Sequence, residues 1–143
     1  MKVLVLNGPN LGTVGRREPE VYGTQTLADL EKLLAERARE LDFELSCLQS
    51  NHEGQLIDWI EKEGAASDAI IINPGALSHY GLALADALRA SGKPIVEVHI
   101  SNVFAREPER HGMVTAAAAK GVISGLGFEG YLAALDFLAA TAG

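Results

Sequence analysis

The stretch Phe43–Asn73, "FELSCLQSNHEGQLIDWIEKEGAASDAIIIN", carries a helical pattern between two short apolar runs. Its first six and last six residues form the two runs. Between them, Leu56, Ile57 and Ile60 lie on one face of a helix that ends at Gly64. A strand, a helix and a second strand of these lengths predict a βαβ unit, in which the two strands pair in parallel.

The same alternation extends to both ends of the chain. The further expected strands are 3–7, 94–100 and 121–125, and the further expected helices are 26–41, 81–92 and 130–142. Thr26 is a suitable N-cap for the first of these helices, and Gly92 is a common C-terminal stop. The sequence therefore predicts one doubly wound α/β domain, residues 1–143, with a five-stranded parallel sheet covered by helices on both faces.

Composition excludes several classes of protein. The chain has 143 residues, 48% of them hydrophobic, and a formal net charge of -7, which argues against binding to nucleic acid or to anionic membranes. Its one cysteine, Cys47, rules out an intramolecular disulfide and fits a reducing compartment. The first apolar run is too short for a signal peptide, and no run approaches the ~20 residues of a membrane span. We therefore expect a soluble, cytoplasmic domain.

The stretch Leu6–Gly23, "LNGPNLGTVGRREPEVYG", shows neither a helical nor a strand period. Irregular segments of this length are usually functional or disordered. In one interpretation it is a solvated surface loop whose tyrosine, Tyr22, only packs. In the other, residues 11–23 form a mobile lid, and the lid's arginines make a phenolate base possible when water is excluded.

In parallel sheets of this kind, ligands bind beyond the carboxyl ends of the strands. The segments expected there, "NGPN", "QSNHEG", "NPGALSH" and "HISNVFAREPER", are rich in groups that bind hydroxyls and carboxylates. Glu97 and His99 are two residues apart on one strand, so their side chains point to the same face. They form either a solvent-facing strand end or a carboxylate–imidazole pair that acts as an acid near neutral pH. Spacing alone is compatible with both.

Two other motifs are interpreted as structural. Gly125, Gly127 and Gly130 match the dinucleotide pattern G-x-G-x-x-G, but only thirteen residues follow, too few for the βαβ unit and acidic residue that such a site requires. Close packing of strand against helix is the better explanation. The four histidines lack the spacing of a metal site, and Cys47 is expected in the core. No metal and no organic cofactor is expected.

Taken in order and spacing, six segments resemble the type II 3-dehydroquinate dehydratases, the small flavodoxin-like dehydroquinases. They are "LNGPNLG...GRREPEVYG", "QSNHEGQLIDWI", "IINPGALSH", "ALADAL", "VEVHISNVFARE" and "GVISGLGFEGYLAAL". The resemblance covers essentially the whole chain. It implies anti elimination of water from 3-dehydroquinate to 3-dehydroshikimate through an enolate, in the shikimate pathway of aromatic amino-acid biosynthesis. It also implies a homododecamer built from trimers, with no cofactor.

Carried over position by position, the resemblance implies five catalytic residues. Tyr22 is the base and Arg17 the lid arginine beside it. His99 is the acid, oriented by Glu97. Asn10 holds the water that stabilises the enolate.

The resemblance also implies a set of residues that bind the substrate. These are Asn73, the backbone of Ile100, and Ser101 on the carboxylate; His79 and Arg110 on ring hydroxyls; Gly75 in the pocket wall; Arg106 near the base; and Asp86 from a neighbouring subunit.

Three segments depart from the family pattern. Tyr80 and Gly81 stand in "SHYG", where the family usually has Thr-His-Thr-Ser. Phe104 stands where His or Tyr is common, and "HGMVT", 111–115, follows Arg110 where His-Ser-Tyr is common. These changes bear on pocket shape, lid docking and subunit packing. The alternative from another class is a non-catalytic flavodoxin-like module that binds a small polyol acid, which has no need of both an acid and a base.

Overall fold

Five parallel strands run through the middle of the molecule in the order β2-β1-β3-β4-β5. Their bounds in this computed structural model, which describes residues 1–142, are β1 (Lys2–Asn7), β2 (Glu44–Gln49), β3 (Ala69–Asn73), β4 (Ile95–His99) and β5 (Gly121–Ser124). The three central strands are almost wholly buried, which explains their continuous apolar runs. The predicted flavodoxin-like doubly wound sheet is confirmed, with boundaries shifted by one or two residues.

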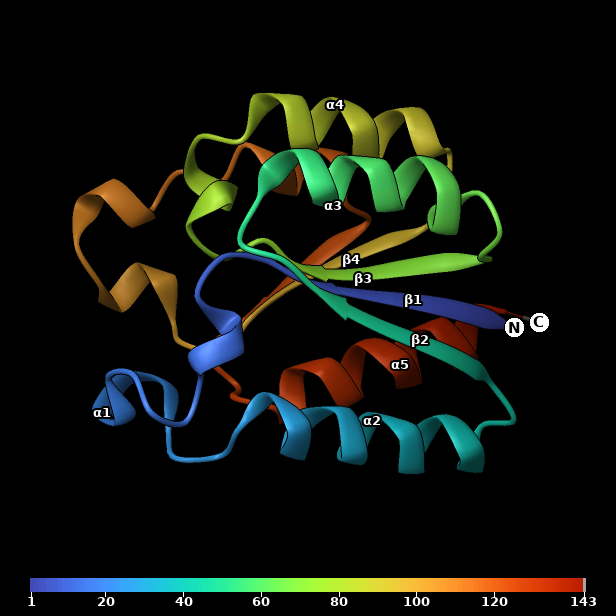
Figure 1. Cartoon of the computed structure of the whole chain (residues 1–143), viewed down its shortest axis with the longest axis horizontal. Helices are drawn as coiled ribbons and strands as arrows, with labels where there is room; N and C mark the ends of the chain where they lie inside the picture. The colour runs from blue at the N-terminus through green and yellow to red at the C-terminus, as the bar shows by residue number, and fades with distance from the viewer. Residues whose placement is uncertain (143) are drawn as a thin grey trace.

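Helices cover both faces of the sheet (Figure 1). The pair α2 (Leu27–Glu40) and α5 (Glu129–Thr141) lies on one face, and the pair α3 (Glu53–Trp59) and α4 (Leu82–Ser91) on the other. Alternate residues of β1 contribute to the two cores: Val3 and Val5 pack with α2 and α5, and Leu4 and Leu6 with α3 and α4. The two helical layers therefore hold the central strands rigidly from both sides.

Local sequence explains where the helices begin and end. The side chain of Thr26 accepts a hydrogen bond from the amide of Asp29 and the Asp29 carboxylate accepts one from the amide of Thr26, a capping box at the start of α2. Gly92 ends α4 in the left-handed conformation, as expected. The helix expected to end at Gly64 is divided: α3 stops at Trp59, and a π-helical turn, η2 (Ile60–Gly64), completes it. The wider turn keeps Ile60 buried.

The stretch expected to be irregular contains regular structure. A 3-10 turn, η1 (Leu11–Thr13), and a short helix, α1 (Pro19–Tyr22), lie within it. Proline is well suited to the first position of a helix, which is where Pro19 stands. Leu11 and Val14 are buried in the core, whereas α1 has no buried residue. The first part of the segment is therefore anchored by two buried side chains, and the short helix in the later part has none.

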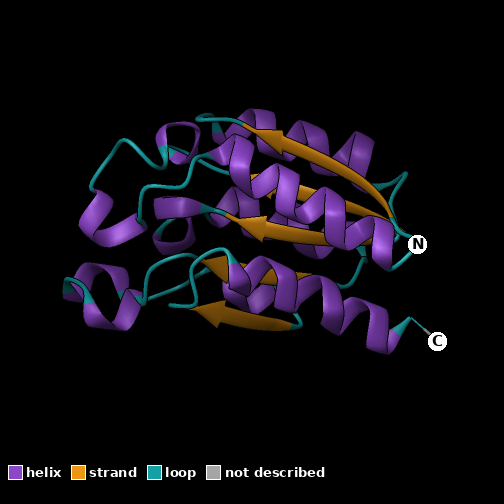
Figure 2. Cartoon of the chain, turned by 90° about the horizontal axis from the view of Figure 1, so that it is seen from below, coloured by secondary structure: helices purple, strands orange, loops and turns teal. Residues whose placement is uncertain are grey.

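All five strands point to the same end of the sheet (Figure 2), and the short helical segments gather there. The chain's two termini lie at the opposite end (Figure 1). None of the helices described for residues 1–142 has the length and apolar character needed to cross a membrane.

Candidate active site

A pocket opens at the carboxyl ends of β1, β3 and β4, beside the point where the strand order reverses. All predicted site residues except Glu97 and Asp86 line it: Asn10, Arg17, Tyr22, Asn73, Gly75, His79, His99, Ile100, Ser101, Arg106 and Arg110. They come from several segments of the chain, between residue 10 and residue 110. The fold thus brings the polar strand ends together as the sequence predicted.

On one side of the pocket, the imidazole of His99 is paired with the carboxylate of Glu97. The distance from Nε2 to Oε2 is 2.7 Å, Glu97 is fully buried and His99 is 5% exposed. The interpretation of a solvent-facing strand end is therefore wrong, and the predicted pairing is confirmed. Because Nε2 is held by the carboxylate, Nδ1 is the ring nitrogen left for the pocket.

Two buried hydroxyl groups hold that carboxylate in turn. Ser78 Oγ donates to Glu97 Oε2 at 2.9 Å, and Thr115 Oγ1 donates to Oε1 at 2.5 Å. Both residues are 0% exposed. A buried carboxylate needs such donors. Sequence reasoning missed both, although Ser78 stands inside the motif "NPGALSH" and Thr115 ends the departing segment "HGMVT".

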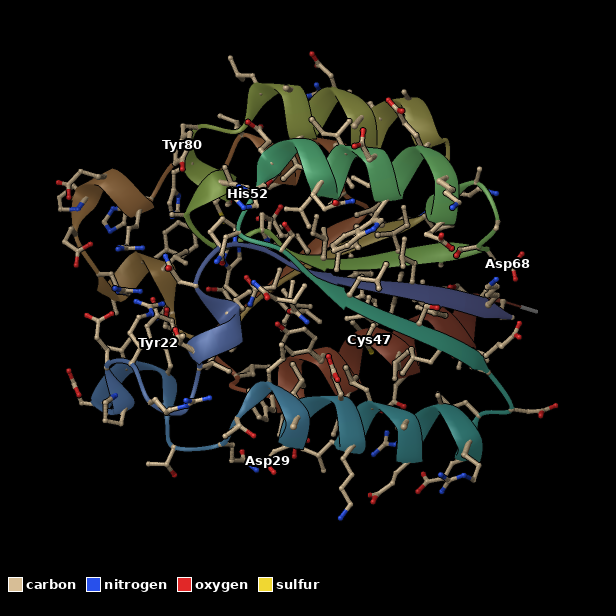
Figure 3. All side chains as sticks on the ribbon, in the orientation of Figure 1. Tyr22, Asp29, Cys47, His52, Asp68 and Tyr80 are labelled. Atoms are coloured by element: carbon tan, nitrogen blue, oxygen red, sulfur yellow. The ribbon has the colours of Figure 1, made fainter. Side chains whose placement is uncertain are left out.

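In the same pocket, two guanidinium groups lie beside the phenol of Tyr22. Arg106 Nη1 donates to Tyr22 Oη at 2.7 Å, and the Arg17 Cζ atom is 4.5 Å from the centre of the tyrosine ring. Tyr22 is the last residue of α1, and Arg106 is the C-terminal cap of the 3-10 turn η4 (Val103–Ala105); in Figure 3 the Tyr22 label lies in the space between these two segments. Arg17 also pairs with Glu18 at 2.7 Å. Arg17 and Arg106 therefore both place a guanidinium group beside the Tyr22 ring.

The amide of Asn73 is engaged at both ends. Its Nδ2 donates to the Tyr131 hydroxyl at 2.9 Å, and its Oδ1 accepts from the Gly75 amide at 3.1 Å. Tyr131 in turn donates to Asn7 Oδ1 at 2.6 Å. Sequence reasoning gave Tyr131 no role, because nothing local marks a tyrosine on a helix as the partner of two strand ends.

His79 and Arg110 lie together at the outer rim of the pocket. His79 Nδ1 lies 2.8 Å from the carbonyl oxygen of Gly112, which leaves Nε2 for the pocket. Arg110 Nε donates to a carboxylate oxygen of Glu107 at 2.5 Å. This hydrogen bond holds the pKa of Glu107 below its ordinary value.

Asn10 adopts the left-handed conformation, with a φ of 70°. The backbone N–H of Asn10 donates to Asn51 Oδ1 at 3.0 Å. Gln49 Nε2 donates to the same oxygen and to the carbonyl oxygen of Gly8, at 3.2 Å each. The polar end of β2, noted in the sequence without a role, therefore fixes the loop that carries Asn10. Such support matters because left-handed backbone is strained for a residue with a side chain.

Asp86 lies outside this pocket, on the exposed surface of α4. Its side chain is 80% exposed and its nearest cation is Arg89, at 3.5 Å. Within one chain it contributes nothing to the pocket.

The departing residues lie around the rim. Tyr80 (Figure 3) and Phe104 are 65% and 57% exposed, and the Phe104 ring lies 5.9 Å from that of His111. Gly81 is needed where it stands, because a Cβ there would meet the carbonyl oxygen of Leu77 at 2.6 Å. None of the departing residues is among those that line the pocket.

The residues interpreted as structural lie outside the pocket. Cys47 faces the helices below the sheet (Figure 3), and burial raises the pKa of its thiol to about 12, so it is not a nucleophile at neutral pH. A Cβ on Gly130 would lie 3.2 Å from Ile123 and 3.3 Å from Val98, which confirms close packing of helix on strand. In residues 1–142 no three His, Cys, Asp or Glu side chains gather as a metal site would need.

Comparison with known proteins agrees with this geometry. Residues 1–139 match the model of the family Dehydroquinase class II. The 3-dehydroquinate dehydratase of Roseiflexus castenholzii is 57% identical over 143 residues, covering 100% of this chain and 91% of the relative. That of Herpetosiphon aurantiacus is 54% identical, covering 96% and 95%. The crystal structure of the type II dehydroquinase from Propionibacterium acnes superimposes with a TM-score of 0.93 at 48% identity, covering 97% and 96% of the two chains.

Proposed function

The chain belongs to the class II dehydroquinase family, and from this premise we propose that Tyr22 and His99 are the base and the acid of its reaction. The protein is a hydro-lyase that converts 3-dehydroquinate to 3-dehydroshikimate in the shikimate pathway of aromatic amino-acid biosynthesis. The observation that carries the assignment is that one pocket is lined by two such groups: a phenol held by Arg106 and an imidazole held by Glu97.

The chemistry needs three kinds of group. A proton leaves the carbon alpha to the ketone, negative charge collects on the enolate oxygen, and the hydroxyl beta to the ketone departs with a proton. A non-catalytic module would need none of these, so the alternative of a simple polyol-acid binder is set aside.

Tyr22 removes the alpha proton as a phenolate. Arg106 donates directly to its oxygen and Arg17 lies over its ring, so both cations stabilise the negative charge before the proton is taken. Closing the pocket over the substrate lowers the local dielectric and strengthens these interactions.

His99 delivers the second proton from Nδ1 to the departing hydroxyl. Its Nε2 remains on Glu97, whose negative charge stabilises the imidazolium that exists before the transfer. Asn10 orients a water molecule toward the enolate oxygen, which spreads the charge formed between the two steps.

The remaining residues hold the substrate. Ser101, the backbone of Ile100 and the free N–H of Asn73 bind the carboxylate, and His79 and Arg110 bind ring hydroxyls. Support comes from their shared place in the pocket wall and, for His79, from a partner that fixes one ring nitrogen.

We further propose that residues 11–23 include a lid that closes over the bound substrate. The moving part is 15–23, because Leu11 and Val14 are buried while α1 has no buried residue. Gly15 and Gly23, at the two ends of this part, both have positive φ angles and can change conformation at little cost.

We also propose a cytoplasmic homododecamer built from trimers, in which Asp86 reaches the pocket of a neighbouring subunit. Support for the contact comes from the exposed position of Asp86, which does not line the pocket of its own chain. The single cysteine with its protonated thiol fits a reducing compartment.

An absorbance assay tests the assignment. Purified protein mixed with 3-dehydroquinate should produce the enone absorbance of the product, and a chelator should leave the rate unchanged. Tyr22→Phe should bind substrate but lose turnover by about 10²–10⁴, the usual contribution of a positioned base. Tyr80→Phe, which changes an exposed tyrosine outside this pocket, is the matched control and should keep the full rate. A Tyr22→Phe variant with normal turnover would show that the base lies elsewhere.

A further inference from the structure

A buried chain of three polar side chains lies directly behind the pocket wall. Tyr131 donates to Asn7 Oδ1 at 2.6 Å and accepts from Asn73 Nδ2 at 2.9 Å. The exposed fractions of the three residues are 0%, 1% and 3%. Figure 1 shows α5 beneath the sheet with its first turn, which carries Tyr131, toward the carboxyl ends of the strands. One hydroxyl therefore joins the ends of β1 and β3.

The direction of these hydrogen bonds is fixed. Burial raises the pKa of Tyr131, so the phenol keeps its single proton at any pH at which the protein works. That proton points at Asn7 Oδ1, since a carbonyl oxygen can only accept. Toward Asn73, the phenol oxygen is consequently an acceptor.

The acceptor in turn fixes the orientation of the Asn73 amide. Nδ2 faces the phenol oxygen, and Oδ1 faces the amide of Gly75 at 3.1 Å. If the amide turned over, its oxygen would meet the lone pairs of the phenol and its NH₂ group would meet the N–H of Gly75. Both buried hydrogen bonds would be lost, and the buried polar groups would be left unpaired. The second N–H of Nδ2 is the polar group that this arrangement leaves for the pocket.

We propose that Tyr131 is a positioning residue that makes Asn73 present an N–H donor, and never its carbonyl oxygen, to the substrate. This rests on the proposed function, in which Asn73 binds a carboxylate. A carboxylate only accepts hydrogen bonds, so an inverted Asn73 would set oxygen against oxygen. The relay Asn7–Tyr131–Asn73 thereby selects substrates that carry an anionic acceptor at this position.

Tyr131→Phe separates this role from packing. The ring, which meets Phe128 edge-on with 6.5 Å between centroids, stays in place, and only the hydroxyl is removed. The KM for 3-dehydroquinate should rise about tenfold while kcat changes less than about twofold, because the lost contact is made equally in the ground state and the transition state.

Two further variants distinguish positioning from stability. Asn7→Leu combined with Tyr131→Phe removes the buried carbonyl that the single change leaves unpaired, so the melting temperature should recover while KM stays high. Leu138→Ala, in the core at the far end of α5, should lower the melting temperature and leave KM unchanged. A KM that instead follows the melting temperature across the three variants would overturn the proposal.

A nuclear magnetic resonance measurement decides the relay without relying on activity. The Asn73 side-chain amide proton that faces Tyr131 should exchange slowly with solvent in the wild type and fast in Tyr131→Phe. Equal exchange in both proteins, or an unchanged KM in Tyr131→Phe, would refute the relay. A wild type that exchanges slowly but never converts 3-dehydroquinate would instead refute the proposed function.

Discussion

At the scale of single residues, the acid depends on a hydroxyl that does not touch the substrate. Thr115 donates to Glu97 at 2.5 Å in a site with no exposure to water. Thr115→Val keeps the shape and leaves one carboxylate oxygen unpaired, at about 1–3 kcal/mol. Because Glu97 then shifts and His99 with it, kcat should fall about tenfold with little change in KM.

Thr115→Ser is the matched control for this change. It keeps the hydroxyl and should retain most of the rate. If Thr115 only filled space in the core, the valine variant would work as well as the serine variant. The measurement is the steady-state kinetics of the two variants, once their melting temperatures have been shown to be equal. Normal kcat in Thr115→Val would mean that Ser78 alone holds the carboxylate.

Cys47 predicts a pH dependence of stability. Its folded pKa, about 12, lies above the ordinary value of 9.0, and desolvation is the main cause. The folded state therefore holds the thiol proton more tightly, and this contribution is complete below about pH 9 and declines as pH rises from about 9 to about 12. Denaturant unfolding at about pH 8 and about pH 11 should show a smaller loss of stability in Cys47→Ala than in the wild type. An identical loss in both proteins would contradict the burial of the thiol.

The role of a single residue could be predicted from the sequence only when its interaction partner lies close to it in the chain. The period of two along a strand placed Glu97 and His99 on one face without tertiary information, but it left open whether they pair or face solvent. The partners of Glu97 lie 18 and 19 positions away, and Tyr131 lies 58 positions from Asn73 and 124 from Asn7. Only the fold brings such groups together, so no local pattern could have assigned them.

At the scale of elements, the strands and long helices were predictable because apolar periodicity and caps define them. The split of the helix after Trp59 was not, since a π-helical turn has no distinct sequence pattern. The short helix α1 was missed because four residues are too few to show a period. Its N-terminal Pro19 was the one available signal.

The proposed lid makes a prediction at this scale. Arg16 is exposed and Arg17 partly so, in the part of the segment that we expect to move, and trypsin cleaves after arginine. Cleavage there should be fast in the free protein and slow when a substrate analogue closes the pocket, as followed by mass spectrometry. Cleavage after Arg39, on exposed α2, is the internal control and should not respond to the analogue. An analogue that slows both sites equally would argue against local closure.

At the scale of the whole molecule, the charge of the pocket is opposite to that of the protein. The chain carries a formal net charge of -7, yet Arg17, Arg106 and Arg110 line the pocket. A cleft lined by one sign of charge attracts ligands of the other sign even when the protein as a whole repels them. The substrate of the family is a carboxylate, so the arginines serve both attraction and the stabilisation of Tyr22.

Assembly supplies the last prediction, because the role that we propose for Asp86 lies between subunits. Asp86→Ala should lower activity without unfolding the chain, and Asp58→Ala, an exposed acid on α3, should not. A mixture of two impaired variants provides a sharper measurement: Asp86→Ala and Tyr22→Phe subunits, unfolded and refolded together, should exceed the activity of either variant alone. A working site then takes Tyr22 from one chain and Asp86 from its neighbour, which random mixing provides in about a quarter of sites. Mixed oligomers without recovered activity, or a fully active monomer by light scattering, would show that each pocket is complete within one chain.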